Sequence, residues 1–153
     1  MIYLGIDPGT NTGIGVVTSV TSAFSVTCRR EDFAETLIDI ISPLEGEILI
    51  GVEKAVAMRR QDLNVGISYG IVLGGLSALS LTWKRLGYVD VAIISWQKSV
   101  LGKFPKGESK IKAKQYIGQR FGIAKRSEHE NDALCIACYL RDKEERKGRL
   151  YEG

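Results

Sequence analysis

The sequence predicts a mixed α/β fold in which one β-sheet is flanked by α-helices. Two patterns support this class: the first part of the chain reads as three successive short strands, and the rest alternates between helical and strand-like segments. Successive strands favour an antiparallel meander, whereas strands separated by helices favour parallel pairing. The chain has 153 residues, 44% hydrophobic and 25% charged, which is typical of one compact domain over residues 1–153.

Three strands are expected at the amino-terminal end of the chain. The first covers residues 2–7 and runs into residues 8–13, where proline, glycine, threonine and asparagine give a dense turn signal. Apolar and β-branched residues then predict strands over residues 14–20 and 24–28. These segments form the predicted meander.

Helices and strands alternate in the remainder of the chain. Apolar residues recur at helical spacing from Phe33 to Ile41, and the apolar run 48–52 ends at Glu53 as a buried central strand would. A long, mostly uncharged helix is predicted over residues 62–87, ending where Gly87 can take the left-handed conformation. The remaining predicted elements are a strand over residues 89–94 and helices over residues 109–121 and 127–143.

The stretch from Leu63 to Trp83 carries no charged residue and is long enough to cross a bilayer as a helix. Polar residues and four glycines interrupt it, so its hydrophobicity is modest. The sequence therefore favours a helix buried in a core or an interface, and no membrane partner is predicted. The amino terminus shows no basic leader with a long apolar core, so we expect a cytoplasmic location.

The three cysteines are expected to be reduced, because their number is odd and no export signal is evident. Cys135 and Cys138 have the spacing of half a zinc site. They lie in a predicted apolar helix without a second matching pair, which favours core thiols over zinc ligands.

The positive charge of the chain is concentrated in one segment. The formal net charge is only +3, yet residues 96–126 hold nine lysines and arginines against one acidic residue, Glu108. A charge run of this kind is usually a solvated face, but a phosphate backbone as partner would explain so uneven a distribution. Nucleic acid is therefore a candidate partner.

Two acidic residues end predicted strands. Asp7 closes the first strand and Glu53 closes the buried strand over residues 48–52. Taken alone, each residue is most simply interpreted as a turn residue, a helix cap or a solvated strand end. Side by side at a sheet edge, however, two such carboxylates repel each other and are costly to desolvate, and a divalent cation resolves both problems.

A third candidate group begins the last predicted helix. His129, the only histidine of the chain, and Asp132 are three residues apart and share one helix face, where either can ligate a metal. Taken alone, this group also reads as a first helical turn enriched in acids that complement the helix dipole. The order and type of all three groups together are more specific.

Three motifs carry a family resemblance. They are Ile6-Asp7-Pro8-Gly9-Thr10 with Gly13, then Val52-Glu53, and then His129-Glu130-Asn131-Asp132-Ala133. Together they resemble the catalytic motifs of RuvC-type Holliday junction resolvases, members of the RNase H-like superfamily. Tyr69-Gly70, Trp96-Gln97-Lys98 to Gly102, and Lys110 are also similar to that family, so the resemblance extends over nearly the whole chain. The short length is similar to that of phage versions of the family. For a phage-encoded protein, the expected cytoplasmic location would be the cytoplasm of the host cell.

The resemblance implies an RNase H-like fold and an enzyme that cuts branched DNA such as four-way junctions, forks and flaps. Asp7, Glu53, His129 and Asp132 would bind two Mg²⁺ or Mn²⁺ ions, with Asp7 bridging them, and hydrolysis would leave 5′-phosphate ends. Lys110 would act beside them, near the cut phosphate. The residues expected to contact DNA are Lys98, Lys103, Lys106, Lys110, Lys112, Lys114, Arg59 and Arg60.

The resemblance also implies a homodimer formed through the helix over residues 62–87, which suits a four-armed substrate. Gly66, Gly70 and Gly74 form a smooth ridge on this helix, and close packing on its own sheet explains them equally well. The sequence departs from the family at Val56, where an aromatic wedge is expected, which puts strict junction selectivity in doubt. Met58, Arg59 and Arg60 could substitute in part.

Three other interpretations of the function remain. The motif around Asp7 also resembles the phosphate loop of actin-like ATPases and sugar kinases, but those proteins need two such domains and a longer chain. A junction-binding protein without activity is disfavoured by the complete set of four ligands. An RNase H-like nuclease acting on RNA precursors is disfavoured only mildly, by the long basic segment.

Overall fold

The computed structural model describes residues 1–54, 63–122 and 126–151 and contains one five-stranded sheet. The strands are β1 (Ile2–Asp7), β2 (Asn11–Val17), β3 (Ala23–Arg29), β4 (Ile48–Glu53) and β5 (Leu86–Val91), in the spatial order β3-β2-β1-β4-β5. The first three pair antiparallel, whereas β4 is parallel to both β1 and β5. The predicted meander followed by parallel strands is therefore confirmed.

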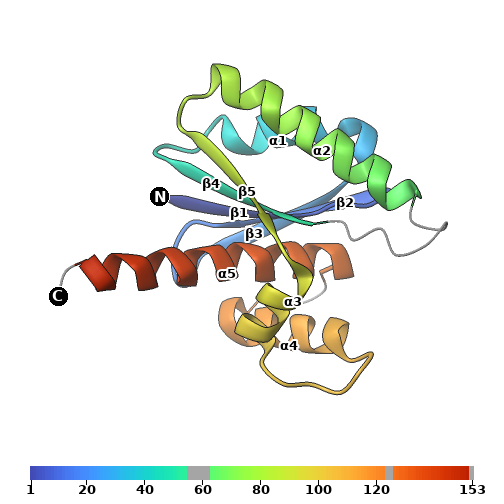
Figure 1. Ribbon diagram of the computed structural model, residues 1–153, viewed down its shortest axis with the longest axis vertical. Helices are drawn as coiled ribbons and strands as arrows, with labels where there is room; N and C mark the ends of the chain where they lie inside the picture. The colour runs from blue at the N-terminus through green and yellow to red at the C-terminus, as the bar shows by residue number, and fades with distance from the viewer. Residues whose placement is uncertain (55–62, 123–125, 152–153) are drawn as a thin grey trace.

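Helices cover both faces of this sheet (Figure 1). Helices α1 (Phe33–Ile41) and α2 (Leu63–Thr82) lie on one face, and α5 (Glu128–Tyr151) crosses the other. Beyond α5 lies a further layer, made of α3 (Ile93–Trp96), the wide helical turn η3 (Gln97–Leu101) and α4 (Ser109–Phe121). The apolar core is accordingly split in two, one cluster on each side of the sheet.

The first hairpin is tighter than the sequence predicts. Strand β2 begins at Asn11 rather than at residue 14, because Asp7 already pairs with Gly13 in the antiparallel register. The hydroxyl of Thr12 donates to the carbonyl of Gly9 over 3.0 Å and helps to close the turn. Asp7 consequently lies at the very end of β1, beside the turn.

The predicted end of the long helix at Gly87 is wrong. Helix α2 stops at Thr82, and Gly87 lies inside β5, because Leu86 pairs with Ile48 and is buried there. Parallel pairing with β4 thus decides the boundary over the local glycine signal. The predicted strand over residues 89–94 is correspondingly displaced, and its last two residues begin α3, which the sequence did not predict.

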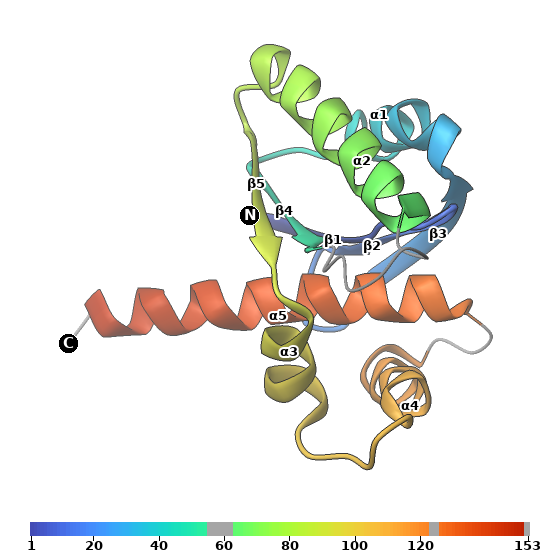
Figure 2. The same cartoon turned by 45° about the vertical axis from the view of Figure 1, so that its right-hand side comes forward.

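Helix α5 also differs from the prediction at its end. It continues to Tyr151 rather than stopping at residue 143, and its last turns project beyond the sheet (Figure 2). Its first turns lie at the opposite end, where β1 and β4 finish (Figure 1). The helix predicted before Pro43 is confirmed as α1, and the helix predicted over residues 109–121 is confirmed with the same bounds as α4.

A row of glycines lets α5 approach the sheet closely. Gly15, Gly5 and Gly51 are register partners across β2, β1 and β4. A Cβ atom on Gly5 would lie 1.9 Å from the carbonyl oxygen of Ala133, and one on Gly15 would lie 2.5 Å from the amide nitrogen of Leu134. Helix α5 therefore packs on bare backbone, which any larger residue would prevent.

The outward face of α2 is largely exposed. Its buried side chains are Ser68, Val72 and Leu76, whereas Cβ atoms placed on Gly66, Gly70 and Gly74 would meet no atom of the described chain within 4 Å. Packing on its own sheet is therefore ruled out as the reason for the glycine ridge. Among the described residues, α2 is the one helix long and apolar enough to span a membrane, by length and composition alone.

Candidate active site

Strand alternation places Asp7 and Glu53 on the same face of the sheet. Leu4 and Ile6 of β1 enter the core beneath α1 and α2, so Gly5 and Asp7 face α5. Strand β4 is in parallel register with β1, and Val52 is the partner of Ile6. Asp7 and Glu53 are the next residues on neighbouring strands, which lie about 4.8 Å apart.

The first turn of α5 brings His129 above this edge. The Nδ1 atom of His129 lies 2.8 Å from Oδ2 of Asp7, although the two residues are far apart in the sequence. Gly13 makes this approach possible, because a Cβ atom there would lie 2.2 Å from the carbonyl oxygen of His129. The glycine that the sequence places after Asp7 thus serves the site directly.

Asp132 faces the same point from the next turn of α5. It is only 4% exposed, and its Oδ2 atom is paired with the ammonium group of Lys110, from the start of α4. Its other oxygen, Oδ1, is buried and has no hydrogen-bond partner among the described residues. A buried carboxylate oxygen left unpaired in this way is costly, and it is the kind of atom that a bound cation satisfies.

Glu53 is held by a residue that the sequence did not assign to the site. The indole nitrogen of Trp96 donates a hydrogen bond to Oε2 of Glu53 over 2.7 Å. Trp96 is 1% exposed and lies in α3, which follows β5 directly. The one sequence signal for this role is the position of Trp96 between the end of a strand and the basic segment. Its hydrogen bond to Glu53, 43 positions away, cannot be predicted from residue spacing.

The pKa values of Glu53 and Asp132 are both raised, mainly by burial and in part by neighbouring carboxylates. Burial, followed by the charge of Asp7, raises the pKa of Glu53 to about 7, against the opposing indole hydrogen bond. Burial also raises the pKa of Asp132 to about 6, although its pairing with Lys110 acts in the opposite direction. The hydrogen bond to Asp7 raises the pKa of His129. The raised pKa values of Glu53 and Asp132 mean that the surrounding residues stabilise their ionised forms poorly.

The donor set suits hard divalent cations, because it offers three carboxylates, one imidazole and the unpaired oxygen Asp132 Oδ1. Within the described residues, no three histidine, cysteine, aspartate or glutamate side chains are arranged to enclose an ion. Instead, Lys110, His129 and Trp96 each engage one carboxylate. A cation entering the site would therefore compete with the ammonium group of Lys110 and with a proton on His129.

Glu130 lies between the two candidate ligands of α5 and has a structural role. Its carboxylate accepts hydrogen bonds from Ser25 and Thr27 of β3, over 2.7 and 3.1 Å, and it pairs with Arg126. After the opposing effect of burial, these hydrogen bonds lower the pKa of Glu130. Glu130 therefore clamps the start of α5 to the sheet and does not join the site.

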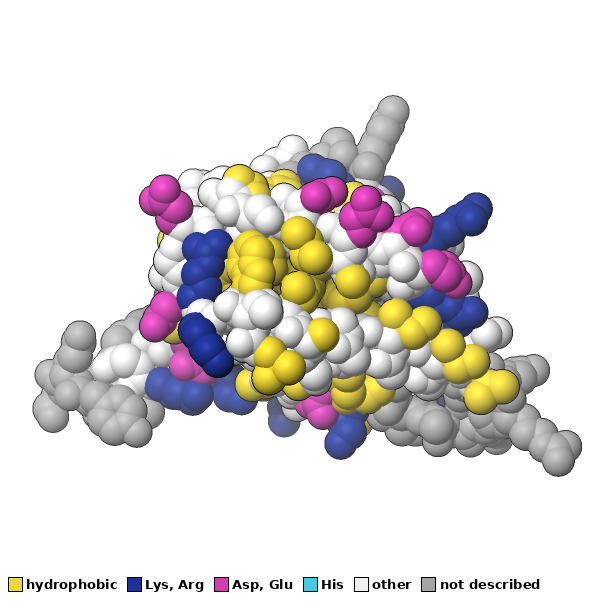
Figure 3. Space-filling model, turned by 90° about the horizontal axis from the view of Figure 1, so that it is seen from above, with side chains coloured by type: hydrophobic (Ala, Val, Ile, Leu, Met, Phe, Trp, Pro, Cys, Tyr) yellow, Lys and Arg dark blue, Asp and Glu magenta, His cyan; other side chains and the backbone are white. Residues whose placement is uncertain are grey.

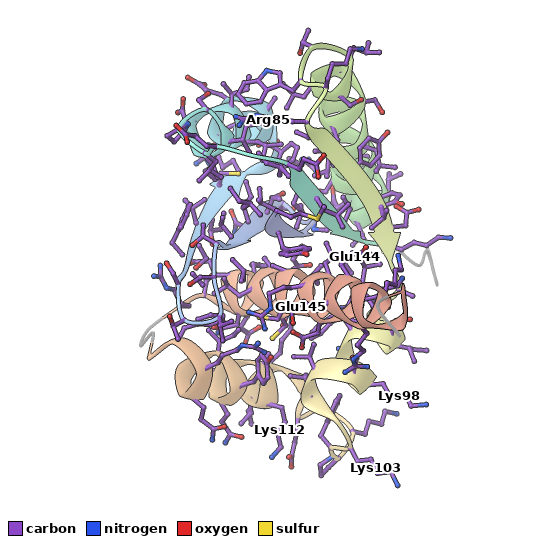
Figure 4. The ribbon with its side chains drawn as sticks, turned by 90° about the vertical axis from the view of Figure 1, so that its left-hand side faces the viewer. Arg85, Lys98, Lys103, Lys112, Glu144 and Glu145 are labelled. Carbon is purple, nitrogen blue, oxygen red and sulfur yellow. The ribbon has the colours of Figure 1, made fainter. Side chains whose placement is uncertain are left out.

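The basic residues lie on the layer formed by η3, α4 and the loop between them. Figure 4 shows Lys98, Lys103 and Lys112 directed away from the sheet. Lys112 is two positions from Lys110 and so lies on another side of α4, where it lines a hollow with Val100 and Leu101. The predicted contacts Arg59 and Arg60, together with Val56 and Met58, lie outside the described residues.

The fold resembles that of known structures more clearly than the sequence resembles known sequences. No protein-family model and no curated protein matches the chain. The structure of Thermus thermophilus RuvC is similar with a TM-score of 0.69 and 20% identity, over 91% of this chain and 92% of that one. T. thermophilus RuvC in complex with a Holliday junction substrate is similar with a TM-score of 0.68 and 20% identity, over 91% of each chain. This protein therefore has the RuvC-type, RNase H-like fold.

Proposed function

We propose that this protein is a divalent-metal-dependent endonuclease that cuts Holliday junctions and other branched DNA. The observation that carries the proposal is the gathering of acidic side chains where β1 and β4 end. Asp7, Glu53 and Asp132 influence one another's charge there, and His129 and Lys110 contact two of them. The same fold is found in a protein captured with a Holliday junction substrate.

Asp7, Glu53, His129 and Asp132 would hold two Mg²⁺ or Mn²⁺ ions, with Asp7 between the other ligands. When bound there, the ions would supply activation of a water for in-line attack on phosphorus and stabilisation of the leaving 3′ oxygen, which would leave a 5′ phosphate. The imidazole of His129 adds one softer donor, which favours Mn²⁺ more than a fourth carboxylate would.

Lys110 is the lysine that contacts the candidate site within the described part of the chain. Its ammonium group is paired with Asp132, and the charges of Asp132, Asp7 and Glu53 together raise its pKa against the effect of burial. Lys110 therefore stays protonated at neutral pH. Released from Asp132, it would neutralise the phosphate that lies across the acidic residues.

The remaining lysines would hold the DNA backbone. Lys98, Lys103, Lys106 and Lys114 are exposed on the layer that carries Lys110. Contacts of this kind fix the position of a duplex without reading its sequence. We therefore propose that they recognise the arms of the substrate, and that selectivity depends on its branched shape.

We also propose a homodimer through α2. Ile67 and Ile71 are about two-fifths exposed beside the open glycine ridge, where nothing in the described chain covers them. Figure 3, which looks down on the α1–α2 layer, shows hydrophobic side chains gathered there with charged ones mainly at the periphery. A self-complementary interface of this kind gives two sites related by a two-fold axis.

The proposal is tested by incubating the protein with a four-way junction, a linear duplex, a flap and an RNA hairpin, each with Mg²⁺ or Mn²⁺. We expect junction cutting that leaves 5′-phosphate ends. Asp7→Asn should keep junction binding and lose cutting, because it preserves shape and removes the central charge. Asp39→Asn, on the exposed side of α1, is the matched control and should cut normally.

The outcomes separate the alternative functions. Preferential cutting of the RNA hairpin would favour a nuclease for RNA precursors. Junction binding without cutting under any cation would favour a binding protein. Equal cutting by the parent and Asp7→Asn would show that Asp7 is not a metal ligand.

A further inference from the structure

Trp96 presents a fixed hydrogen-bond donor to the candidate site. Its ring lies in the core cluster that also contains Val91, Ala113 and Ile117, and its side chain is almost fully buried. Packing of this kind leaves a large ring one orientation. The indole nitrogen is directed at Glu53 Oε2, 2.7 Å away.

The backbone that carries Trp96 is fixed to the strand that carries Glu53. Val91 at the end of β5 is the register partner of Glu53, and its carbonyl accepts a hydrogen bond from the amide of Lys54 over 2.9 Å. The four-residue helix α3 begins two residues later. Donor and acceptor therefore belong to one rigid corner of the sheet.

We infer that Trp96 is a positioning residue, which orients Glu53 so that its free oxygen faces Asp7 and a divalent cation. The indole N–H is a neutral donor, so it satisfies one oxygen without neutralising the carboxylate. A lysine or arginine at this place would compete with the cation. This inference rests on the metal-dependent site proposed above.

The variant Trp96→Phe tests this role, because it keeps a buried aromatic ring and removes only the N–H donor and part of the ring. Calorimetric titration of the DNA-free protein with MnCl₂ should show an affinity about 10-fold weaker than that of the parent, the usual effect of losing an outer-shell partner. Trp83→Phe is the matched control, since Trp83 lies beyond the end of α2 with the Arg85 guanidinium over its ring, and the change should leave the affinity unchanged.

A second readout needs no change at Trp96. In the Trp83→Phe background Trp96 is the only tryptophan, and MnCl₂ or MgCl₂ should alter its fluorescence as Glu53 takes the ion. The added change Glu53→Gln should abolish this response. Equal affinity of Trp96→Phe and the parent, or unchanged emission while calorimetry records binding, would overturn the inference. A parent protein that binds neither cation would overturn the metal site itself.

A separate observation concerns a shallow hollow beside α3. It has a volume of about 420 Å³ and is lined by Ile94, Gln97, Lys98, Gly102, Lys103 and Phe104. Ile94 is 79% exposed, which is more than any other large hydrophobic side chain in the described chain. No acidic residue of the described chain lines the hollow.

This composition matches an unpaired nucleotide. An aromatic ring and an aliphatic side chain provide stacking and apolar surface for a base, two lysines pair with its phosphates, and the Gln97 amide can bond a base edge. We infer that the hollow receives an unpaired nucleotide at the branch point of the DNA substrate. This inference also rests on the proposed function.

The test compares junction DNA carrying 2-aminopurine at the branch point with a fully paired duplex of equal length. Phe104→Ala should weaken junction binding about 10-fold, lower the 2-aminopurine response and leave duplex binding unchanged. Phe24→Ala, an exposed phenylalanine on β3, is the control. Equal losses on junction and duplex, or no loss on either, would overturn this inference, whereas a parent that binds no junction would overturn the proposed function.

Discussion

The imidazole nitrogen Nδ1 of His129 lies 2.8 Å from Oδ2 of Asp7, and this contact joins the first turn of α5 to the end of β1. The Asp7 carboxylate raises the pKa of His129, so the imidazole holds its proton to higher pH than a free histidine. Cation binding requires the neutral imidazole. If the site binds a cation as proposed, the contact would therefore couple metal binding to proton release.

Proton release on metal binding is the first prediction. Calorimetric titration with Mn²⁺ at pH 7, in two buffers of different ionisation enthalpy, should show that protons leave the protein. His129→Asn should release fewer protons than the parent, while Glu53, with a pKa of about 7, continues to contribute. Identical heats in both buffers would show that neither group is displaced by the ion.

The pH dependence of stability without metal is the second prediction. The pKa of Glu53 is raised to about 7 from 4.5, so between these values the folded protein binds the proton more tightly than the unfolded chain. The free energy of unfolding in EDTA should therefore fall as pH rises through this window. Glu53→Gln should be more stable than the parent at pH 8, by on the order of 2 kcal/mol, but not at pH 4.5. Urea unfolding measures both values, and a gain that is equal at the two pH values would contradict the assignment.

The third prediction concerns the glycine row. Gly5→Ala would place a methyl group 1.9 Å from the Ala133 carbonyl oxygen and should cost about 3 kcal/mol or more, or prevent folding. Gly148→Ala, in the projecting part of α5 where an added Cβ meets none of the described residues, should stabilise by about 0.5–1 kcal/mol. Thermal unfolding distinguishes the two, and a harmless Gly5→Ala would mean that α5 does not rest on β1.

Self-association is the fourth prediction. Ile71 is 39% exposed on α2, and Ile71→Glu should convert a dimer into a monomer in analytical ultracentrifugation, because it places two like charges across a two-fold axis. Val20→Glu, on the exposed β2–β3 hairpin, should not change the sedimentation coefficient. A parent protein that is monomeric at every concentration would reject the α2 interface.

Salt dependence is the fifth prediction. If Lys98 and Lys114 each neutralise a phosphate, the slope of log affinity against log salt should become about one unit shallower for Lys98→Ala and again for Lys114→Ala. The exposed Lys84 lies beyond α2, so Lys84→Ala should leave the slope unchanged. Binding that hardly varies with salt in the parent would exclude a phosphate-based mode.

Much of the fold follows from local patterns, and the places where prediction failed depend on non-local pairing. Asp7 and Glu53 end strands that alternation and hydrophobicity predict, α1 ends before Pro43 as predicted, and α4 has the predicted bounds. Gly87 looked like a helix stop, yet pairing with β4 makes it part of a strand. Trp96 reaches Glu53 only once β4, β5 and α3 are assembled, so spacing alone could not show it.

The glycine row was the overlooked sequence signal. Gly5, Gly13, Gly15 and Gly51 alternate with apolar residues in three strands that the sequence does predict. Such alternation leaves one face of a strand without side chains, which indicates that another backbone lies against it. The alternation of glycine with apolar residues thus predicts that the last helix packs over β1, β2 and β4.

The glycine row also determines how the spacing within the site is set. Because an added Cβ on Gly5 or Gly15 would collide with main-chain atoms of α5, close backbone contact with β1 and β2 limits the gap between helix and sheet. Substitutions that enlarge or shrink the apolar clusters can therefore change the interior of the molecule while His129 and Asp132 keep their height above Asp7. The backbone contacts between α5 and the strands therefore set the distances between the site residues.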